Sequence, residues 1–180
     1  MPIAPNGRPL AGFGDRLLAY LIDLAIYLGI SLIWLIPLMI WWFTATMDMM
    51  RGFTSTPLDP YEPMPDPSGF FLEFYLPMFV FVVVSVVLSL LYTYLYYVEY
   101  QLKRGGQTVG KRMMKLWVTP VHPGERLSRG HLAKRWGVQY VGGSLVPVLS
   151  YVDGFWQLWD KPLQQCLHDK AAATVVVKVG

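Results

Sequence analysis

The sequence predicts an all-α polytopic membrane protein. Hydrophobic residues make up 54% of the 180 positions and charged residues only 15%, which is too apolar for an ordinary soluble domain of this length. Two apolar runs, at 16–43 and 70–100, are each long enough to cross the roughly 30 Å hydrocarbon core of a bilayer at about 1.5 Å per residue. We therefore expect two full transmembrane helices, a broken third membrane region at 136–159 and a small cytoplasmic β-pairing.

The first apolar run holds one formal charge, Asp23, with Arg16 at its start. Seven residues are nearly two helical turns, so both side chains lie on one face, about 10 Å apart along the axis. A carboxylate at this depth costs at least about 2.5 kcal/mol on insertion scales, so it needs a partner, a proton or water. Asp23 is therefore expected to face protein or a cavity, and not lipid.

The segments around the second apolar run set the topology. Residues 44–69 carry five prolines and a net charge of −3, which predicts an irregular loop. The run at 70–100 ends in a tyrosine-rich stretch that is typical of the membrane interface. Residues 103–135 then hold nine basic side chains against one acidic. By the positive-inside rule this segment is cytoplasmic, which places 44–69 outside and the N-terminus inside.

The basic segment contains a glycine-rich stretch, GGQTVGKR, whose last two residues are Lys111 and Arg112. A third base, Lys115, follows shortly after it. The spacing of this stretch is similar to a phosphate-binding loop, but Arg112 stands where a magnesium-binding Ser or Thr is needed. An interfacial helix from Thr108 would turn the three bases toward anionic lipid head groups, at about 1 kcal/mol each. Its other face would be apolar: Val109, Met113 and Leu116. The alternative is that the bases are only a topology signal.

Region 136–159 is long enough to cross the membrane once, but Gly142, Gly143 and Pro147 interrupt its middle. The tail at 160–180 contains a β-branched run, ATVVVKV, and its one similar partner is KLWVT in the basic segment. If these two runs pair, they share one side of the membrane and the C-terminus is cytoplasmic. Region 136–159 is then a re-entrant hairpin, whose broken backbone must be buried in protein or face water. A simple third span is the alternative.

Three blocks of the sequence resemble the RDD family of bacterial inner-membrane proteins, which is named for one arginine and two aspartates. The blocks are AGFGDRLLAYLIDLAI at 11–26, GGQTVGKRMMKLWV at 105–118 and DGFWQLWDKPLQQCLHDKAAATVVV at 153–177. By this match, Arg16 and Asp23 correspond to the arginine and the first aspartate, and Asp169 corresponds to the second. The resemblance implies a single membrane domain over 1–180, located in the inner membrane, with a suggested role in transport.

We expect Arg16, Asp23 and Asp169 to form one functional cluster on the cytoplasmic side, in which the arginine neutralises the carboxylates. Such a cluster serves either as an ion or proton pathway or as a structural ion pair that fixes how the helices pack. Possible secondary polar groups are Glu99, Asp153 and His168.

Two functions remain open. One is ion- or proton-coupled transport, and the other is a non-catalytic accessory or scaffold subunit of a larger envelope complex. The sequence has no repeated halves, which favours the subunit or a homo-oligomer. It also has no nucleophile–base pair and no metal-ligand spacing, so we expect no enzymatic activity, cofactor or metal site. The expected partners are anionic membrane lipids and either further copies of the chain or another membrane protein, without nucleic acid.

Overall fold

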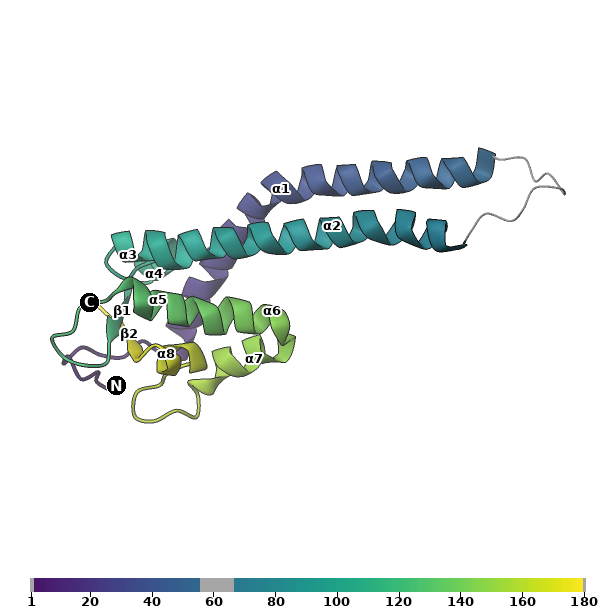
Figure 1. The fold of residues 1–180 in the computed structure, drawn as a ribbon. Helices are drawn as coiled ribbons and strands as arrows, with labels where there is room; N and C mark the ends of the chain where they lie inside the picture. Colours follow the sequence, from purple (N-terminus) through teal and green to yellow (C-terminus); the bar gives the residue numbers. More distant parts are fainter. Residues whose placement is uncertain (1, 56–66, 180) are drawn as a thin grey trace. The chain divides into compact units, whose positions relative to one another are not determined.

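The computed structural model describes residues 2–55 and 67–179, and most of them are helical (Figure 1). The chain divides into two compact units, Leu28–Ser89 and the combination of Met1–Tyr27 with Leu90–Gly180. Two long helices carry the apolar runs. Helix α1 spans Phe13–Ser55, and α2 spans Pro67–Tyr94 before it continues through a π-helical turn, η1 (Leu95–Tyr100), and α3 (Gln101–Lys103).

Both helices are long and apolar enough to cross a membrane, over Phe13–Arg51 and Phe71–Lys103. The core helix of a soluble protein passes the same test of length and composition, but it is mostly buried. In the most apolar window of these two helices, only 6% and 0% of the residues are buried within the chain. Their apolar surface therefore faces outward, as a lipid-exposed helix requires.

The unit Leu28–Ser89 contains the C-terminal part of α1 and the N-terminal part of α2, where the Trp42 and Phe81 rings lie 6.0 Å apart. The loop predicted at 44–69 is wrong at both ends, because α1 stays helical to Ser55 and α2 begins at Pro67. Proline is tolerated in the first helical turn, where its missing N–H has no intrahelical partner to lose. The remaining part of that predicted loop, 56–66, lies outside the described residues.

The other unit is built around a two-stranded sheet. Strands β1 (Leu116–Pro120) and β2 (Thr174–Lys178) pair antiparallel with Val118 opposite Val176, which is the strand pair that the sequence predicts. Both faces of the sheet are covered. The residues buried on one side are Ala11, Ala19, Val98, Leu116, Val118, Leu132 and Val176, and those on the other are Ala4, Leu10, Val175 and Val177.

The two ends of the chain meet at this sheet. Leu10 forms a β-bridge with Val177, and the Ala11 N–H donates to the Val176 carbonyl at 3.0 Å. The Lys178 ammonium lies 2.9 Å from both carboxylate oxygens of Asp15, in the first turn of α1. The N-terminal segment, the C-terminal strand and β1 of the basic segment therefore form one body.

Helix α4 (Val109–Met113) begins as the sequence predicts, with Thr108 as its N-cap. The predicted interfacial helix is otherwise wrong, because α4 ends at Met113 and the chain enters β1 at Leu116. Pairing with β2 buries Leu116 completely, so Leu116 cannot belong to an exposed apolar face of α4. The sheet therefore takes the residues that would have extended the helix.

Region 136–159 belongs to a helical hairpin. One arm is α5 (Arg129–Trp136), the π-helical turn η2 (Gly137–Gly142) and α6 (Gly143–Leu145), and the returning arm is α7 (Pro147–Trp156). The helix is interrupted at Val146, whose φ of −131° and ψ of 91° suit a residue that precedes proline. A Cβ on Gly142 would lie 2.9 Å from the Leu149 side chain, and one on Gly143 would overlap Ser150 Oγ. The glycine pair therefore allows the two arms to pack closely. After the hairpin, the chain forms one more short helix, α8 (Leu167–Ala171).

Candidate functional site

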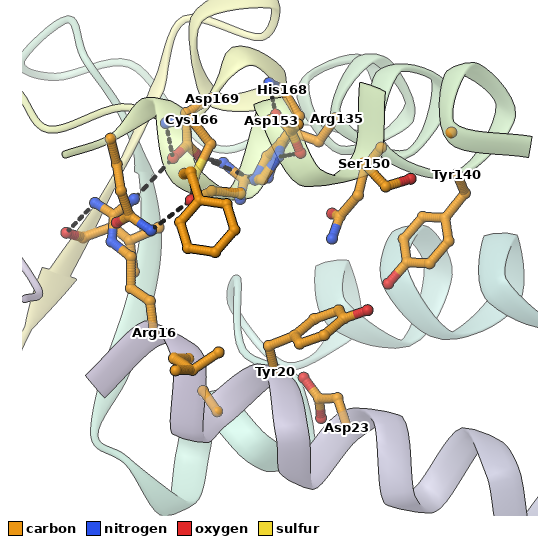
Figure 2. Close-up of a pocket in the computed structure, with 18 of the residues that line it drawn as sticks. Arg16, Tyr20, Asp23, Arg135, Tyr140, Ser150, Asp153, Cys166, His168 and Asp169 are labelled. Carbon is orange, nitrogen blue, oxygen red and sulfur yellow. Dashed lines mark hydrogen bonds and ion pairs between the residues drawn. The ribbon is translucent and has the colours of Figure 1, made fainter. Parts of the chain in front are cut away.

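One face of α1 lines a cavity of about 660 Å³ in the unit that holds the sheet. Arg16, Tyr20 and Asp23 are spaced i, i+4 and i+7 along α1 and all line this cavity. Figure 2 shows Arg16 directed from α1 toward Asp169 of α8, and Tyr20 directed into the space between α1 and the hairpin. The spacing follows from the helical repeat, which the sequence alone supplies. The opposite wall is provided by η2, α7 and α8, so the cavity joins segments more than a hundred residues apart.

Asp169 forms the most buried ionic group of the cavity. It is 0% exposed and lies in α8, where the Cys166 N–H donates to Oδ2 at 3.1 Å. Arg16 Nη1 donates to the same oxygen at 2.9 Å, and Arg135 Nη1 forms an ion pair with Oδ1. Burial acts to raise the pKa of this carboxyl, but the charges of Arg135, His168 and Arg16 hold it well below its ordinary value. Asp169 is therefore a fixed anion.

The two arginines also bind the sheet. Arg135 Nη1 donates to Thr174 Oγ1 at 2.6 Å, and Arg16 Nη2 donates to the Val176 carbonyl at 3.4 Å. This set of contacts ties α1, α5 and α8 to β2 around a single carboxylate. An arginine fork suits the task, because its donors diverge in a plane and each can meet a different acceptor.

Asp23 lies in a separate site within the same cavity. Its Oδ1 accepts from the Tyr96 hydroxyl at 2.8 Å and from the Gly110 N–H at 2.7 Å, and its Oδ2 accepts from Thr108 Oγ1 at 2.6 Å. Tyr96 comes from η1, whereas Thr108 and Gly110 belong to the glycine-rich stretch before and inside α4. Three donors satisfy the buried carboxylate without a cation. A Cβ on Gly110 would overlap the Ala19 carbonyl oxygen, so only glycine allows this approach.

The predicted single cluster is therefore divided in two. Arg16 and Asp169 form the expected ion pair, but the oxygens of Asp23 are occupied by hydroxyl and backbone donors. The physical reason is the two helical turns between Arg16 and Asp23, which put Asp23 opposite α4 instead of α8. Both groups still line one cavity.

The secondary groups lie in different places. Asp153, in α7, accepts from the His168 N–H at 2.8 Å, and its Oδ2 lies 2.6 Å from Nδ1 of the same residue. This buried pair fastens the hairpin to α8 and lines the cavity. Glu99 lies elsewhere, in an ion pair with the exposed Arg129 at 2.7 Å.

The three bases expected at lipid head groups do not share one surface. Arg112 and Lys115 are exposed, whereas Lys111 is half-buried and lines the cavity with its ammonium 5.6 Å from the Tyr97 ring centroid. Burial, together with the nearby charge of Arg135, lowers the pKa of Lys111 to about 8. The placement of Lys111 on a lipid-facing surface is thus wrong, because the short α4 turns its first basic side chain inward.

Cys166, His168 and Asp169 bring potential metal-ligand atoms within 4.8 Å of one another. Two arginines already hold the Asp169 carboxylate, and Nδ1 of His168 lies against Asp153. Burial also raises the pKa of the Cys166 thiol to about 12, so this sulfur stays protonated. The donor set is therefore poorly suited to a cation.

Several site residues were missed by sequence reasoning: Tyr96, Thr108, Gly110, Arg135, Gln139 and Tyr140. The two π-helical turns supply three of them, Tyr96 from η1 and Gln139 and Tyr140 from η2. Such turns are frequent at functional sites, but a single sequence gives no signal for them. The glycine-rich stretch did give a signal, since its spacing suggested an anion-binding loop.

Comparison with known proteins identifies one family. The model of the RDD family matches residues 10–173, which is nearly the whole chain. No curated protein and no solved structure matches the chain. The matched range contains every charged residue of the cavity.

Proposed function

Since the chain belongs to the RDD family, a family of membrane proteins, we propose that it is a multi-pass protein of the bacterial inner membrane that transports a small solute or ion through the charged cavity. One observation carries this proposal: buried and half-buried ionisable groups from α1, α4, α5, α7 and α8 line a cavity of about 660 Å³. That volume lies within the usual range for a small-molecule site. Ionisable side chains on a membrane-spanning helix commonly mark a transport pathway.

The proposed orientation places both chain ends and 103–135 in the cytoplasm. The excess of basic residues in 103–135 supports it, as does the sheet that joins the two chain ends to β1. Segments held in one sheet lie on one side of a membrane. The hairpin between β1 and β2 would then enter and leave on the same side.

The hairpin's exposed surface supports a re-entrant or interfacial position. Its returning arm is too short to cross, since the ten residues of α7 span about 15 Å, half of a hydrocarbon core. The exposed large apolar residues of this region are Leu145, Val146, Val148, Tyr151, Val152, Phe155, Trp156, Leu158 and Trp159. A surface of this kind is costly in water and favourable in the membrane interface. Arg112 and Lys115 would meet anionic head groups, and oligomers would help to enclose a pathway.

A second candidate function is a non-catalytic accessory subunit. The observation that favours it is the commitment of each cavity carboxylate to fixed partners, which suits a rigid joint as well as a pathway. We propose no enzymatic activity in either case, because Cys166 is held as a thiol and His168 is engaged with Asp153.

The test is flux in proteoliposomes. Wild-type protein should transport a solute or cation under a pH or ion gradient, and Gln139→Trp, which fills the cavity, should remain folded and lose that flux. Arg112→Gln, on the exposed surface, is the matched control and should transport normally. If wild type shows no flux under any gradient, the accessory role replaces transport. Mass spectrometry of proteins that co-purify in mild detergent then identifies the complex.

A further inference from the structure

The carboxylates of the cavity are already hydrogen-bonded within the protein, whereas some of its donors are not. Asp23 receives three donors, Asp169 receives two arginines and a backbone N–H, and Asp153 is engaged by His168. A cation that entered would have to displace these donors from each carboxylate. The cavity therefore offers few free acceptors to a positively charged guest.

Free donors do remain. Among the described residues, no carboxylate forms an ion pair with Lys111. Nε of Arg16 is buried without a hydrogen-bond partner, on a side chain that is only 8% exposed. An unpaired buried donor is destabilising, and an acceptor from a ligand would offset that cost. The residues Arg16 and Lys111 both line the cavity, and the positive charge of each favours a negatively charged guest.

The walls indicate what else the guest carries. Aromatic rings surround the polar groups: Phe13, Tyr20, Tyr97, Tyr140, Tyr151 and Phe155. Figure 2 shows Tyr20 and Tyr140 directed into the space between α1 and the hairpin. Flat apolar bodies pack well against such rings. Tyr151 is 70% exposed and Phe155 47%, so the aromatic wall continues to the surface of the unit and offers a way in.

We propose that the cavity binds a small organic anion with an aromatic body, such as an aryl carboxylate, and that Lys111 is the residue that pairs with its charge. This inference rests on the proposed function, because it names the substrate class of the same cavity. The anionic group would lie between the Lys111 ammonium and the Arg16 guanidinium edge, with the ring against the tyrosines.

The environment of Lys111 gives the site a pH dependence. The groups that act on its ammonium are Arg16 and Asp23 of α1, Tyr97 of η1, Arg135 of α5 and Asp169 of α8. With its pKa near 8, Lys111 is mostly protonated at pH 7 and loses its charge as the pH rises through 8. Binding of a permanent anion should weaken over that interval.

The test uses purified wild-type protein in mild detergent at pH 7, with binding measured by calorimetry. The probes are 2-naphthoate, its neutral analogue 2-naphthamide and the cation 2-naphthylmethylammonium. Naphthoate should bind best, and Lys111→Gln should weaken it by about 10- to 100-fold, as loss of a charged hydrogen bond implies, while binding of the amide changes little. Lys115→Gln, an exposed lysine four positions away, is the matched control and should leave both affinities unchanged.

A second variant separates charge from folding. Lys111→Arg keeps the cation, so it should bind naphthoate at pH 7 and still bind it at pH 9.5, where wild type has weakened. The proposal is overturned if the amide or the ammonium binds wild type as tightly as naphthoate does, or if folded Lys111→Gln keeps full affinity for naphthoate. It is also overturned if dihexanoyl phosphatidylglycerol competes with naphthoate for the site and has the higher affinity of the two, because the occupant is then a lipid. Naphthoate binding without flux would refute transport alone, whereas cation flux without naphthoate binding would refute this inference alone.

Discussion

Gly110→Ala tests the contact between α4 and α1 on which the Asp23 site depends. A Cβ at this position would overlap the Ala19 carbonyl oxygen and would lie 2.9 Å from Oδ1 of Asp23. Neither group can move freely, because one is helix backbone and the other is held by Tyr96 and Thr108. Helix α4 must therefore shift away from α1, and the 2.7 Å hydrogen bond from the Gly110 N–H to Asp23 is weakened or lost.

Two costs combine in this variant. Forcing a methyl group into a packed contact typically costs about 1–3 kcal/mol. Losing a hydrogen bond to a charged group costs about 1.5–3 kcal/mol more. The free energy of unfolding should therefore fall by about 2.5–6 kcal/mol, a large share of the roughly 5–15 kcal/mol that keeps a domain folded.

The matched control is Gly29→Ala, a glycine inside α1, where an added Cβ meets nothing within 4 Å. Alanine favours a helix over glycine by up to about 1 kcal/mol, so this variant should be as stable as wild type or slightly more so. Unfolding is followed by tryptophan fluorescence as dodecyl sulfate is added to maltoside micelles. If Gly110→Ala unfolds at the same detergent ratio as Gly29→Ala, the close approach of α4 to Asp23 is wrong.

Three further predictions follow from the buried ion cluster and the sheet. Asp169→Asn should cost about 3–5 kcal/mol, because it leaves two buried arginines uncompensated, whereas Asp160→Asn removes a more exposed pair and should cost no more than about 1 kcal/mol; equal losses in the unfolding titration would contradict the cluster. The pKa of Asp169 lies below its ordinary value of 3.8, so its contribution to stability is present above that pH and is lost as the pH falls; wild type should lose stability on acidification more steeply than Asp169→Asn, as measured by melting at pH 5 and below. Cysteines at Val118 and Val176 should crosslink on oxidation, whereas Val118 with Val175, whose side chains point to opposite faces, should not.

Part of the site could be predicted because helical periodicity fixes which residues of one helix share a face. Arg16 and Asp23 line one cavity for that reason. The likeness between KLWVT and ATVVVKV was enough to suggest the strand pair, and that pair brings the C-terminal strand to the start of α1. From there the contact of Arg16 with Asp169 follows, since Asp169 lies five residues before β2.

The remaining site residues could not be predicted, because their partners are remote in sequence and chemically ordinary. Arg135 is one of nine bases in 103–135, and nothing local distinguishes the one that pairs with Asp169 from those in solvent. The inward direction of Lys111 depends on where α4 ends, and that end is set by strand pairing with a segment some sixty residues away. Tertiary packing decides both cases, and it produces no periodic pattern in the sequence from which these contacts could be predicted.

The glycine-rich stretch before α4 explains how α1 tolerates a carboxylate at the depth of Asp23. Anion-binding loops use backbone N–H groups and a hydroxyl, with glycine where the anion must approach closely. Gly110 and Thr108 supply these groups here, and the anion is a side chain of the protein's own first helix. A nucleotide-binding loop needs a Ser or Thr at the position of Arg112 to hold the magnesium ion that coordinates the phosphates. The anion here is a carboxylate, so no magnesium ion and no such residue are needed. Since Asp23 is satisfied only when this stretch is folded against α1, the placement of the first helix and the folding of the basic segment depend on each other.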